Sequence, residues 1–388
     1  MIQLDTPYVP ESLGYDSSRL DVLHHFFQGQ IDKKVLIGAS YAITREGKLF
    51  AAGAIGKQSF REEDKRPLKP DTIFRIYSIT KLFTAVAVFK LVEDGLCRLD
   101  ETMKTWLPEM DTEDFSKVTI AHALSHTGGL PVAAGVYPLK EGELDCRQLI
   151  EQEFQRGGRD WITAALKKGR ESEPGTRWEY SSLGMILLGV LIERITGVRA
   201  ERYIEENILR FCGMPDSGFW DTMKNRSDIA DRLFIQFEDT EKELNNPDQH
   251  SPWEAVPGTA GHMFSTVADL ANFGNMLLNG GRLDGRRVLG RIAVEKMTSV
   301  YTKPHIKSFC WQDGGRYKPY GLGSDLGLED FYLITPGTYH HEGWGRSRLS
   351  VDPEKRFVSA YFVPFVEPDV WDPIPSYNTQ AIISSGLI

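Results

Sequence analysis

The chain has 388 residues, of which 41% are hydrophobic and 26% charged, a composition typical of folded globular proteins and unlike that of disordered, collagen-like or membrane-spanning chains. Its formal net charge is −9, and the sequence contains no stripe of basic residues. We therefore expect no nucleic-acid partner. The four cysteines lie far apart and form no Cys-x-x-Cys pair, which indicates neither a disulfide framework nor a zinc knuckle.

The first residues of the chain carry no targeting pattern. They lack both the positively charged start and the apolar core of a secretory signal. The longest apolar runs, such as residues 185–192, are far below the ~18–20 residues that a membrane-spanning helix needs. We therefore expect a cytoplasmic protein with no membrane partner, and the sequence does not indicate its oligomeric state.

The N-terminal part of the chain predicts a helix, a hairpin and a long buried helix. Residues 19–28 place apolar side chains at helical spacing, and residues 35–56 contain two β-rich runs around a turn at 45–47. The mainly apolar segment 76–95 predicts one long helix that ends at Gly95 and lies at the centre of the fold.

The rest of the chain is first helical and then β-rich. Between about 96 and 250 helical patterns dominate. The later elements are predicted from their apolar periodicity. Helices are expected within 147–170 and at 182–196, 265–279, 290–299 and 376–386, and strands at 338–350 and 356–364.

This order of elements predicts an α/β fold of the α+β kind. Strands from the two ends of the chain share one antiparallel sheet flanked by helices, and the middle of the chain forms a mainly helical lobe. We expect one domain over 1–388, with residues 1–75 and 255–388 in the α/β lobe and residues 76–254 in the helical lobe. The cleft between the lobes is the expected place for chemistry.

Ser78 and Lys81 are the first candidate pair for catalysis. They form a Ser-x-x-Lys pattern at the head of the apolar helix, and this spacing places a hydroxyl and an amine on one helix face. An amine carried into an apolar setting loses hydration unless its pKa falls or it gains a partner, and both conditions suit a base. The alternative from these residues alone is a snorkelling lysine beside a capping serine.

Two further segments contain candidates. Tyr180 follows a Pro-Gly turn and precedes the helix at 182–196, where a nearby Lys81 ammonium would lower the phenol pKa from ~10 and make it a base. The alternative for Tyr180 is a packed aromatic. Near the C-terminus, His341 could bind substrate, Gly343 allows close approach, and the N–H of Trp344 on a strand could face an oxyanion. The alternative for these residues is ordinary turn chemistry.

Several other kinds of site are missing from the sequence. There is no Gly-x-Ser-x-Gly elbow, no phosphate loop and no His-Glu-x-x-His zinc pattern. His122 and His126 have a spacing that could bind a metal, but no third ligand is indicated near them. The sequence therefore indicates no metal and no cofactor.

Taken together, the three segments resemble one family. A Ser-x-x-Lys, a Tyr-x-Ser about a hundred residues later and a His-x-Gly near the C-terminus look like the β-lactamase-related serine hydrolases, which include class C β-lactamases, D-alanyl-D-alanine peptidases and family VIII carboxylesterases. The likeness covers almost the whole chain, from about residue 10 to 365. The segments that carry it are 74–101, 124–131, 174–197, 258–281 and 341–362.

The resemblance implies a fold and a mechanism. It implies a single serine-hydrolase domain in which Ser78 attacks the substrate carbonyl and Tyr180, as tyrosinate or through Lys81, takes the proton. The main-chain N–H groups of Ser78 and Trp344 would stabilise the oxyanion. The resemblance also implies a structural role for His126.

Two departures from the family pattern favour esters over amides. Ser182 stands where the lactamases have the asparagine of Tyr-x-Asn, so a carboxamide is replaced by a short hydroxyl. His341 stands where they have a charged lysine, and an imidazole is mostly neutral at pH 7. We therefore expect a carboxylesterase or acyltransferase acting on small esters. The alternatives are a β-lactamase or peptidase acting on amides, and a non-catalytic binding protein.

Loop aromatics are candidates for an apolar acyl pocket. The loops contain several large aromatic side chains that could shape such a pocket or could equally be packing. These residues are Tyr137, Trp253, Trp311 and Tyr317.

Overall fold

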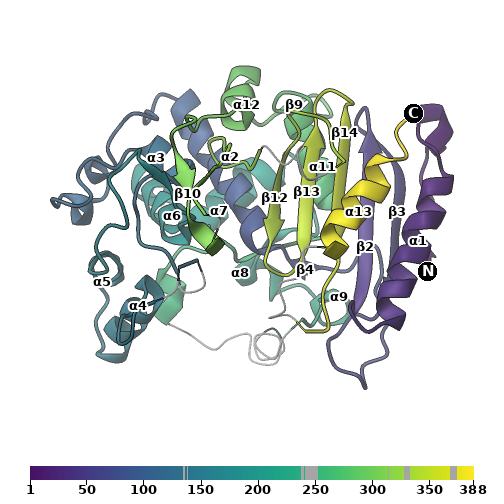
Figure 1. Ribbon diagram of the computed structural model, residues 1–388, viewed down its shortest axis with the longest axis horizontal. Helices are drawn as coiled ribbons and strands as arrows, with labels where there is room; N and C mark the ends of the chain where they lie inside the picture. Colours follow the sequence, from purple (N-terminus) through teal and green to yellow (C-terminus); the bar gives the residue numbers. More distant parts are fainter. Residues whose placement is uncertain are drawn as a thin grey trace.

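The computed structural model describes residues 1–133, 136–137, 139–236, 240, 252–312, 314–326, 333–367 and 374–388. Its largest sheet has six antiparallel strands from the two ends of the chain (Figure 1). These strands are β1 (Ile2–Gln3), β2 (Gly38–Arg45), β3 (Lys48–Gly56), β12 (Tyr339–Gly343), β13 (Ser347–Asp352) and β14 (Phe357–Phe362). Their order across the sheet is β1-β3-β2-β14-β13-β12. The expected sheet of N- and C-terminal strands is confirmed.

Short strands form three smaller sheets. One contains β4 (Phe74–Arg75), β7 (Met263–Ser265) and β6 (Gly218–Phe219), a second contains β11 (Arg316–Tyr317), β10 (Lys307–Ser308) and β5 (Arg177–Trp178), and a third pairs β8 (Arg282–Leu283) with β9 (Arg286–Arg287). In the second sheet, β10 pairs with β5, the strand that precedes Tyr180, although the two strands are more than a hundred residues apart in the sequence.

Helices account for most of the remaining regular structure. The α-helices are α1 (Ser18–Asp32), α2 (Thr80–Glu93), α3 (Ile120–Leu124), α4 (Cys146–Gln155), α5 (Trp161–Leu166), α6 (Ser182–Thr196), α7 (Ala200–Ile204), α8 (Trp220–Met223), α9 (Ile229–Arg232), α11 (Val267–Leu278), α12 (Arg291–Thr298) and α13 (Ile374–Ser384). The 3₁₀ segments are η1 (Pro10–Leu13), η2 (Tyr77–Ile79), η3 (Met103–Thr105), η4 (Pro108–Met110), η6 (Pro252–Ala255) and η7 (Cys310–Gln312), and η5 (Glu205–Leu209) is a π-helical turn.

The hairpin of β2 and β3 is a local consequence of its turn residues. Glu46 and Gly47 both have positive φ, 54° and 76°, which is the backbone of a two-residue type I′ turn and matches the twist of the flanking strands.

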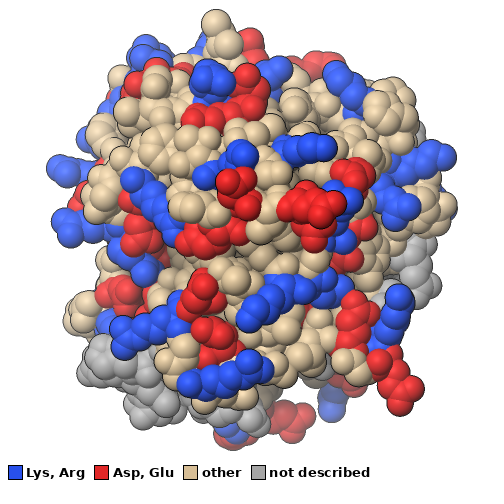
Figure 2. Space-filling view, turned by 90° about the vertical axis from the view of Figure 1, so that its left-hand side faces the viewer, with Lys and Arg blue, Asp and Glu red and all other residues tan. Residues whose placement is uncertain are grey.

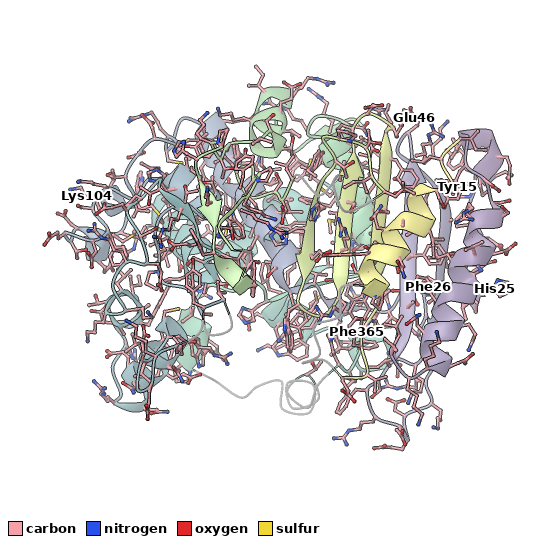
Figure 3. All side chains as sticks on the ribbon, in the orientation of Figure 1. Tyr15, His25, Phe26, Glu46, Lys104 and Phe365 are labelled. Carbon is pink, nitrogen blue, oxygen red and sulfur yellow. The ribbon has the colours of Figure 1, made fainter. Side chains whose placement is uncertain are left out.

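α1 and α13 cover one face of the sheet. In Figure 3, Tyr15 and Phe26 lie on the sheet side of α1 and the exposed His25 points outward. Apolar side chains of both layers form this smaller core.

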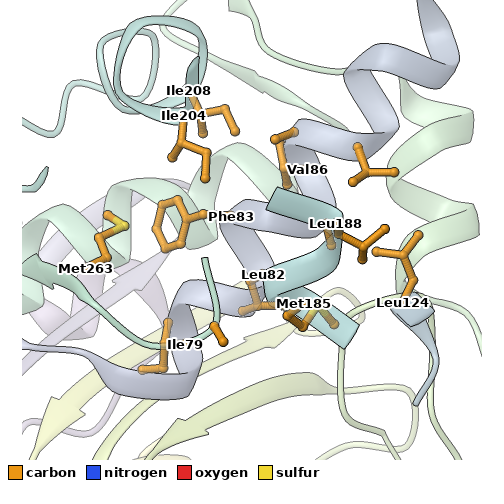
Figure 4. Packing of buried hydrophobic residues seen from close by; sticks show 14 of the residues in the cluster. Ile79, Leu82, Phe83, Val86, Leu124, Met185, Leu188, Ile204, Ile208 and Met263 are labelled. Atoms are coloured by element: carbon orange, nitrogen blue, oxygen red, sulfur yellow. The ribbon is translucent and has the colours of Figure 1, made fainter. Parts of the chain in front are cut away.

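The other face of the sheet leads into the main core. α11 packs against β14, β13 and β2. α2 lies deeper and is buried at every residue from Thr80 to Phe89, which explains why its sequence is apolar all round instead of amphipathic. Figure 4 shows Leu82, Phe83 and Val86 of this helix enclosed by side chains of α6, α7 and β7. The start of α2 is therefore held rigidly from several sides.

One predicted strand proved to be a hairpin. The run 338–350 was expected as a single strand, but it divides into β12 and β13 around a turn at 344–346. Gly343 pairs with Ser347, and Arg346 takes the left-handed conformation with φ 67°. An arginine is an unusual residue at such a φ, so the sequence does not mark this turn. The run 147–170 similarly divides into α4 and α5.

The described surface carries both signs of charge. Figure 2 shows lysine and arginine interspersed with aspartate and glutamate over the helical side of the molecule. Within the described residues, no helix combines the length and apolarity needed to cross a membrane. We retain the division into an α/β sub-lobe (1–75 and 255–388) and a helical sub-lobe (76–254) as a proposal.

Candidate active site

Ser78 lies where η2 runs into α2. The preceding residue, Tyr77, has a φ of 46°. For any residue other than glycine this left-handed conformation costs about 1 kcal/mol or more of conformational free energy, so it persists only where the surroundings enforce it. Ser78 itself is half-buried, so its hydroxyl can meet a ligand. In the first helical turn its N–H also has no intrahelical acceptor. The strained junction therefore presents both a hydroxyl and an N–H at one point.

Lys81 lies one helical turn further on and is wholly buried. Its Nζ is 2.9 Å from Ser78 Oγ and donates a 2.7 Å hydrogen bond to the carbonyl oxygen of Ala260. Burial lowers the pKa of Lys81 to about 7, because the charged form loses its hydration in the core. Near neutral pH a large fraction of this side chain is therefore a neutral amine that can accept the Ser78 proton.

Tyr180 is positioned by the elements on both sides of it. β5 ends at Trp178, and Ser181 caps α6 by accepting a hydrogen bond from the N–H of Gly184. The Tyr180 hydroxyl is hydrogen-bonded with Ser78, and its ring centroid lies 4.8 Å from Lys81 Nζ. The geometry thus brings all three predicted residues together around one hydroxyl.

The surroundings of Tyr180 favour a neutral phenol over the expected tyrosinate. Burial raises the pKa of Tyr180 above its ordinary value, and this effect outweighs the hydrogen bond with Ser78 that lowers it. The sequence-based argument assumed a fully charged Lys81, whereas a pKa of about 7 leaves about half of that amine neutral at pH 7. Tyr180 is therefore a phenol that can donate or relay a proton, and Lys81 is the better base.

His341 lies on β12 and is buried beside this group. Its Nδ1 is 2.9 Å from the Glu342 carbonyl oxygen, which makes Nδ1 the protonated nitrogen. Its Nε2 is then an acceptor and lies 3.5 Å from the Tyr320 hydroxyl. Burial, reinforced by the nearby Lys81, lowers the pKa of His341 to about 3, so the ring is neutral at pH 7. Nothing in the sequence marked Tyr320 as a neighbour of this histidine.

Gly343 and Trp344 bring the β12 hairpin against the Ser78 segment. A Cβ on Gly343 would lie 2.3 Å from the carbonyl oxygen of Ile76, so only glycine allows this approach. The Trp344 ring meets the Tyr77 ring edge-on at 5.6 Å between centroids. Trp344 lies in the turn after β12, not on a strand as predicted, because the run folds back at this point. The hairpin turn therefore packs against the segment that leads into α2.

Gly343→Ala tests this close approach. The added methyl group would meet a backbone carbonyl that cannot move aside cheaply. We expect the free energy of unfolding to fall by ~1–3 kcal/mol and the rate of any reaction catalysed at this site to fall by about tenfold or more as the hairpin shifts. Thermal unfolding and initial rates measure the two effects. Gly29→Ala in α1, where a Cβ meets no atom within 4 Å, is the matched control and should lose neither.

The remaining predicted residues have supporting or peripheral positions. Ser182 is the half-buried first residue of α6. His126 accepts a hydrogen bond at Nδ1 from the N–H of Ser181, and its ring lies 4.7 Å from that of Tyr180, so it supports the tyrosine loop. His122 caps α3. In the part of the chain that the structure describes, no three His, Cys, Asp or Glu side chains are grouped to hold a metal ion.

Only some of the loop aromatics gather at this site. Tyr137 packs on the apolar cluster that contains Trp178, and the ring of Trp311 lies 5.2 Å from that of Tyr180. Trp253 instead packs edge-on against Phe154. Tyr317 donates a hydrogen bond to the Thr302 carbonyl oxygen.

Comparison with known proteins adds to this geometry. The sequence model of the family described as beta-lactamase matches residues 23–370. Protein Rv1367c of Mycobacterium tuberculosis is 29% identical over 364 residues, covering 86% of each chain. Esterase EstB of Burkholderia gladioli is 33% identical over 212 residues, covering 52% of this chain and 51% of EstB. Unliganded simvastatin synthase (LovD) from Aspergillus terreus has the same fold, with a TM-score of 0.76 and 20% identity over 95% of this chain and 98% of that one.

Proposed function

The chain belongs to the beta-lactamase family of serine hydrolases, and from this premise we propose that it is a carboxylesterase or acyltransferase that works through an acyl-enzyme on Ser78. The observation that carries the proposal is the contact between Ser78 Oγ and Lys81 Nζ, 2.9 Å apart at a strained helix start. A half-buried hydroxyl beside a wholly buried amine is the arrangement that activates a serine nucleophile.

The proposed reaction has two steps. Ser78 Oγ forms a bond to the ester carbonyl carbon while its proton passes to Lys81 Nζ. As the carbon–oxygen bond to the alcohol breaks, that proton is returned through the Tyr180 hydroxyl to the leaving oxygen. Water or another alcohol then attacks the acyl-enzyme in the reverse sense, which frees Ser78 and releases an acid or a new ester.

The oxyanion of each step needs donors that are already in place. We assign this role to the N–H groups of Ser78 and Trp344, because the β12 hairpin turn packs against the segment that precedes Ser78. A preorganised donor of this kind lowers the free energy of the transition state by ~3–4 kcal/mol in other serine hydrolases.

Esters suit this site better than amides. His341 is a neutral ring at pH 7 and cannot hold a substrate carboxylate as a charged lysine would. Ser182 offers a short hydroxyl at the helix start where a carboxamide would contact an amide side chain. Both features weaken recognition of peptide and lactam substrates and leave simple ester binding unaffected.

Parallel assays on two chromogenic substrates test the choice of substrate. We expect short p-nitrophenyl esters to be hydrolysed with a kcat/KM at least about 100-fold above that for a chromogenic cephalosporin, a difference equal to ~2.7 kcal/mol in transition-state binding. Dominant opening of the lactam would favour the amide alternative. Loss of both reactions in a folded protein that no serine-directed probe labels would favour the non-catalytic alternative.

A further inference from the structure

Trp311 is a large aromatic side chain held in an unfavourable position beside Tyr180. Its backbone has a φ of 50°, a left-handed conformation that is costly for a tryptophan. Its N–H donates a 3.0 Å hydrogen bond to the Val136 carbonyl oxygen. The adjacent Cys310 is buried and its Sγ accepts a hydrogen bond from the N–H of Tyr180. The segment that leads into this strained residue is therefore held in place.

The side chain of Trp311 leaves an open aromatic face at the site. It is 54% exposed, although its ring centroid lies 5.2 Å from that of Tyr180 and 6.3 Å from that of Trp178. Together these three rings form an aromatic wall that ends at the candidate nucleophile. A flat apolar group placed on the free part of the Trp311 ring would complete this wall.

The position of the wall decides which part of an ester it can meet. Lys81 is wholly buried, whereas Tyr180 is half-buried and its hydroxyl is hydrogen-bonded with Ser78, so the proposed reaction returns the proton to the leaving oxygen from the Tyr180 hydroxyl. The alcohol part of the ester therefore leaves the reaction centre along the Tyr180 side. The Trp344 N–H, proposed as an oxyanion donor, lies in the β12 hairpin turn beside Tyr77.

The wall also suits an uncharged group. Tyr180 keeps its proton, because burial raises its pKa, and the ring of His341 is neutral at pH 7. Lys81 Nζ lies 4.8 Å from the Tyr180 ring centroid, and burial lowers its pKa to about 7. Lys318 Nζ lies 5.4 Å from the Trp178 ring centroid and is paired with Asp325 Oδ1 at 2.7 Å. The wall itself consists of uncharged rings, so it favours an uncharged group.

We infer that Trp311 is a specificity-determining residue that binds an uncharged aromatic alcohol group of the substrate by stacking. This inference rests on the proposed function, because the assignment to the alcohol side follows from the proton transfer by Tyr180. It makes aryl esters the preferred substrate class.

Phenyl acetate and ethyl acetate test the inference, because both form the same acetyl-enzyme. Acid release on a pH-stat gives kcat/KM for each ester with wild type, Trp311→Ala and Trp311→Phe. We expect Trp311→Ala to lower the phenyl-to-ethyl ratio of kcat/KM by roughly three- to tenfold, and Trp311→Phe to restore most of it. Phe309→Ala, which removes another exposed ring from the same segment, is the matched control and should leave the ratio unaltered.

Two results would overturn the inference. One is an unchanged phenyl-to-ethyl ratio in Trp311→Ala. The other is a loss of discrimination only between methyl benzoate and methyl acetate, which would place the aromatic group on the acyl side. Binding of phenyl acetate to Ser78→Ala, with and without Trp311→Ala, separates this inference from the proposed function. A three- to tenfold weaker affinity of the double variant supports stacking even if wild type hydrolyses neither ester, and equal affinities contradict it.

Discussion

Ser78→Ala will lower kcat for a p-nitrophenyl ester by at least about 10⁴-fold, the largest effect that we expect from any single substitution. The variant removes the atom that forms the bond to the acyl group, while the backbone N–H that could stabilise an oxyanion stays in place. Only the residual contribution of binding and oxyanion stabilisation is then left. Initial rates of p-nitrophenol release for both proteins measure the loss.

A serine remote from the site provides the control for this result. Ser12 is exposed on η1 and its hydroxyl donates a hydrogen bond to the Val9 carbonyl oxygen. Ser12→Ala should keep full activity. A Ser78→Ala protein that unfolds like wild type and still hydrolyses the ester at a similar rate would remove Ser78 from the mechanism.

Lys81→Met will lower kcat by about 10²- to 10⁴-fold with little change in KM, the second largest effect expected. Methionine keeps the length and apolar volume of the side chain but has no amine to take the Ser78 proton. Tyr180→Phe, which removes only the relaying hydroxyl, should lower kcat in the same direction. A change confined to KM in either variant would make that residue a binding group instead of a base or relay.

The loss in Lys81→Met should not come from unfolding. The pKa of this lysine is lower in the folded state, about 7, than its ordinary 10.5, so the unfolded chain binds the proton more tightly. This pKa difference lowers the free energy of unfolding at every pH below 10.5, and by the largest amount below pH 7. The free energy of unfolding therefore rises as the pH increases from 7 to 10.5. Lys81→Met removes this pKa difference, so its thermal unfolding at pH 7 should occur at or above the wild-type temperature. Lys90→Met, further along α2, is the activity control.

The pH dependence of kcat/KM distinguishes the two possible bases. Only neutral Lys81 can accept the proton, so kcat/KM should fall about tenfold for each pH unit below pH 7 and level off above pH 8. A profile that stays flat to pH 5 would exclude this amine as the base. A profile that rises only near pH 10 would indicate a tyrosinate or an ordinary lysine.

The sequence predicted the parts of the site that depend on local spacing. Ser78 and Lys81 are one turn apart at the head of a segment whose apolar residues already require burial, and Tyr180 follows a Pro-Gly turn and precedes an apolar helix. The expected end of α2 at Gly95 also agrees with the structure, where Gly95 follows the helix with φ 70°. These features follow from periodicity, capping and glycine conformation, all of which act within a few residues.

The features that the sequence did not predict depend on contacts between distant segments. The pKa of Tyr180 was expected to fall, but it is raised because the fold buries the ring, and burial at a loop cannot be derived from neighbours in sequence. The turn at 344–346 was missed because its left-handed residue is an arginine. Trp311 reaches Tyr180 only because β10 pairs with β5, a pairing between segments more than a hundred residues apart.

The most direct test of the central claim is mass spectrometry of the intact protein after rapid acid quench of a reaction with p-nitrophenyl acetate. The account predicts a single added acetyl group that appears within the first turnovers, maps by proteolysis to the peptide containing Ser78, and is absent from Ser78→Ala. Turnover without any adduct on Ser78, or an acetyl group on another residue whose loss abolishes the reaction, would contradict it.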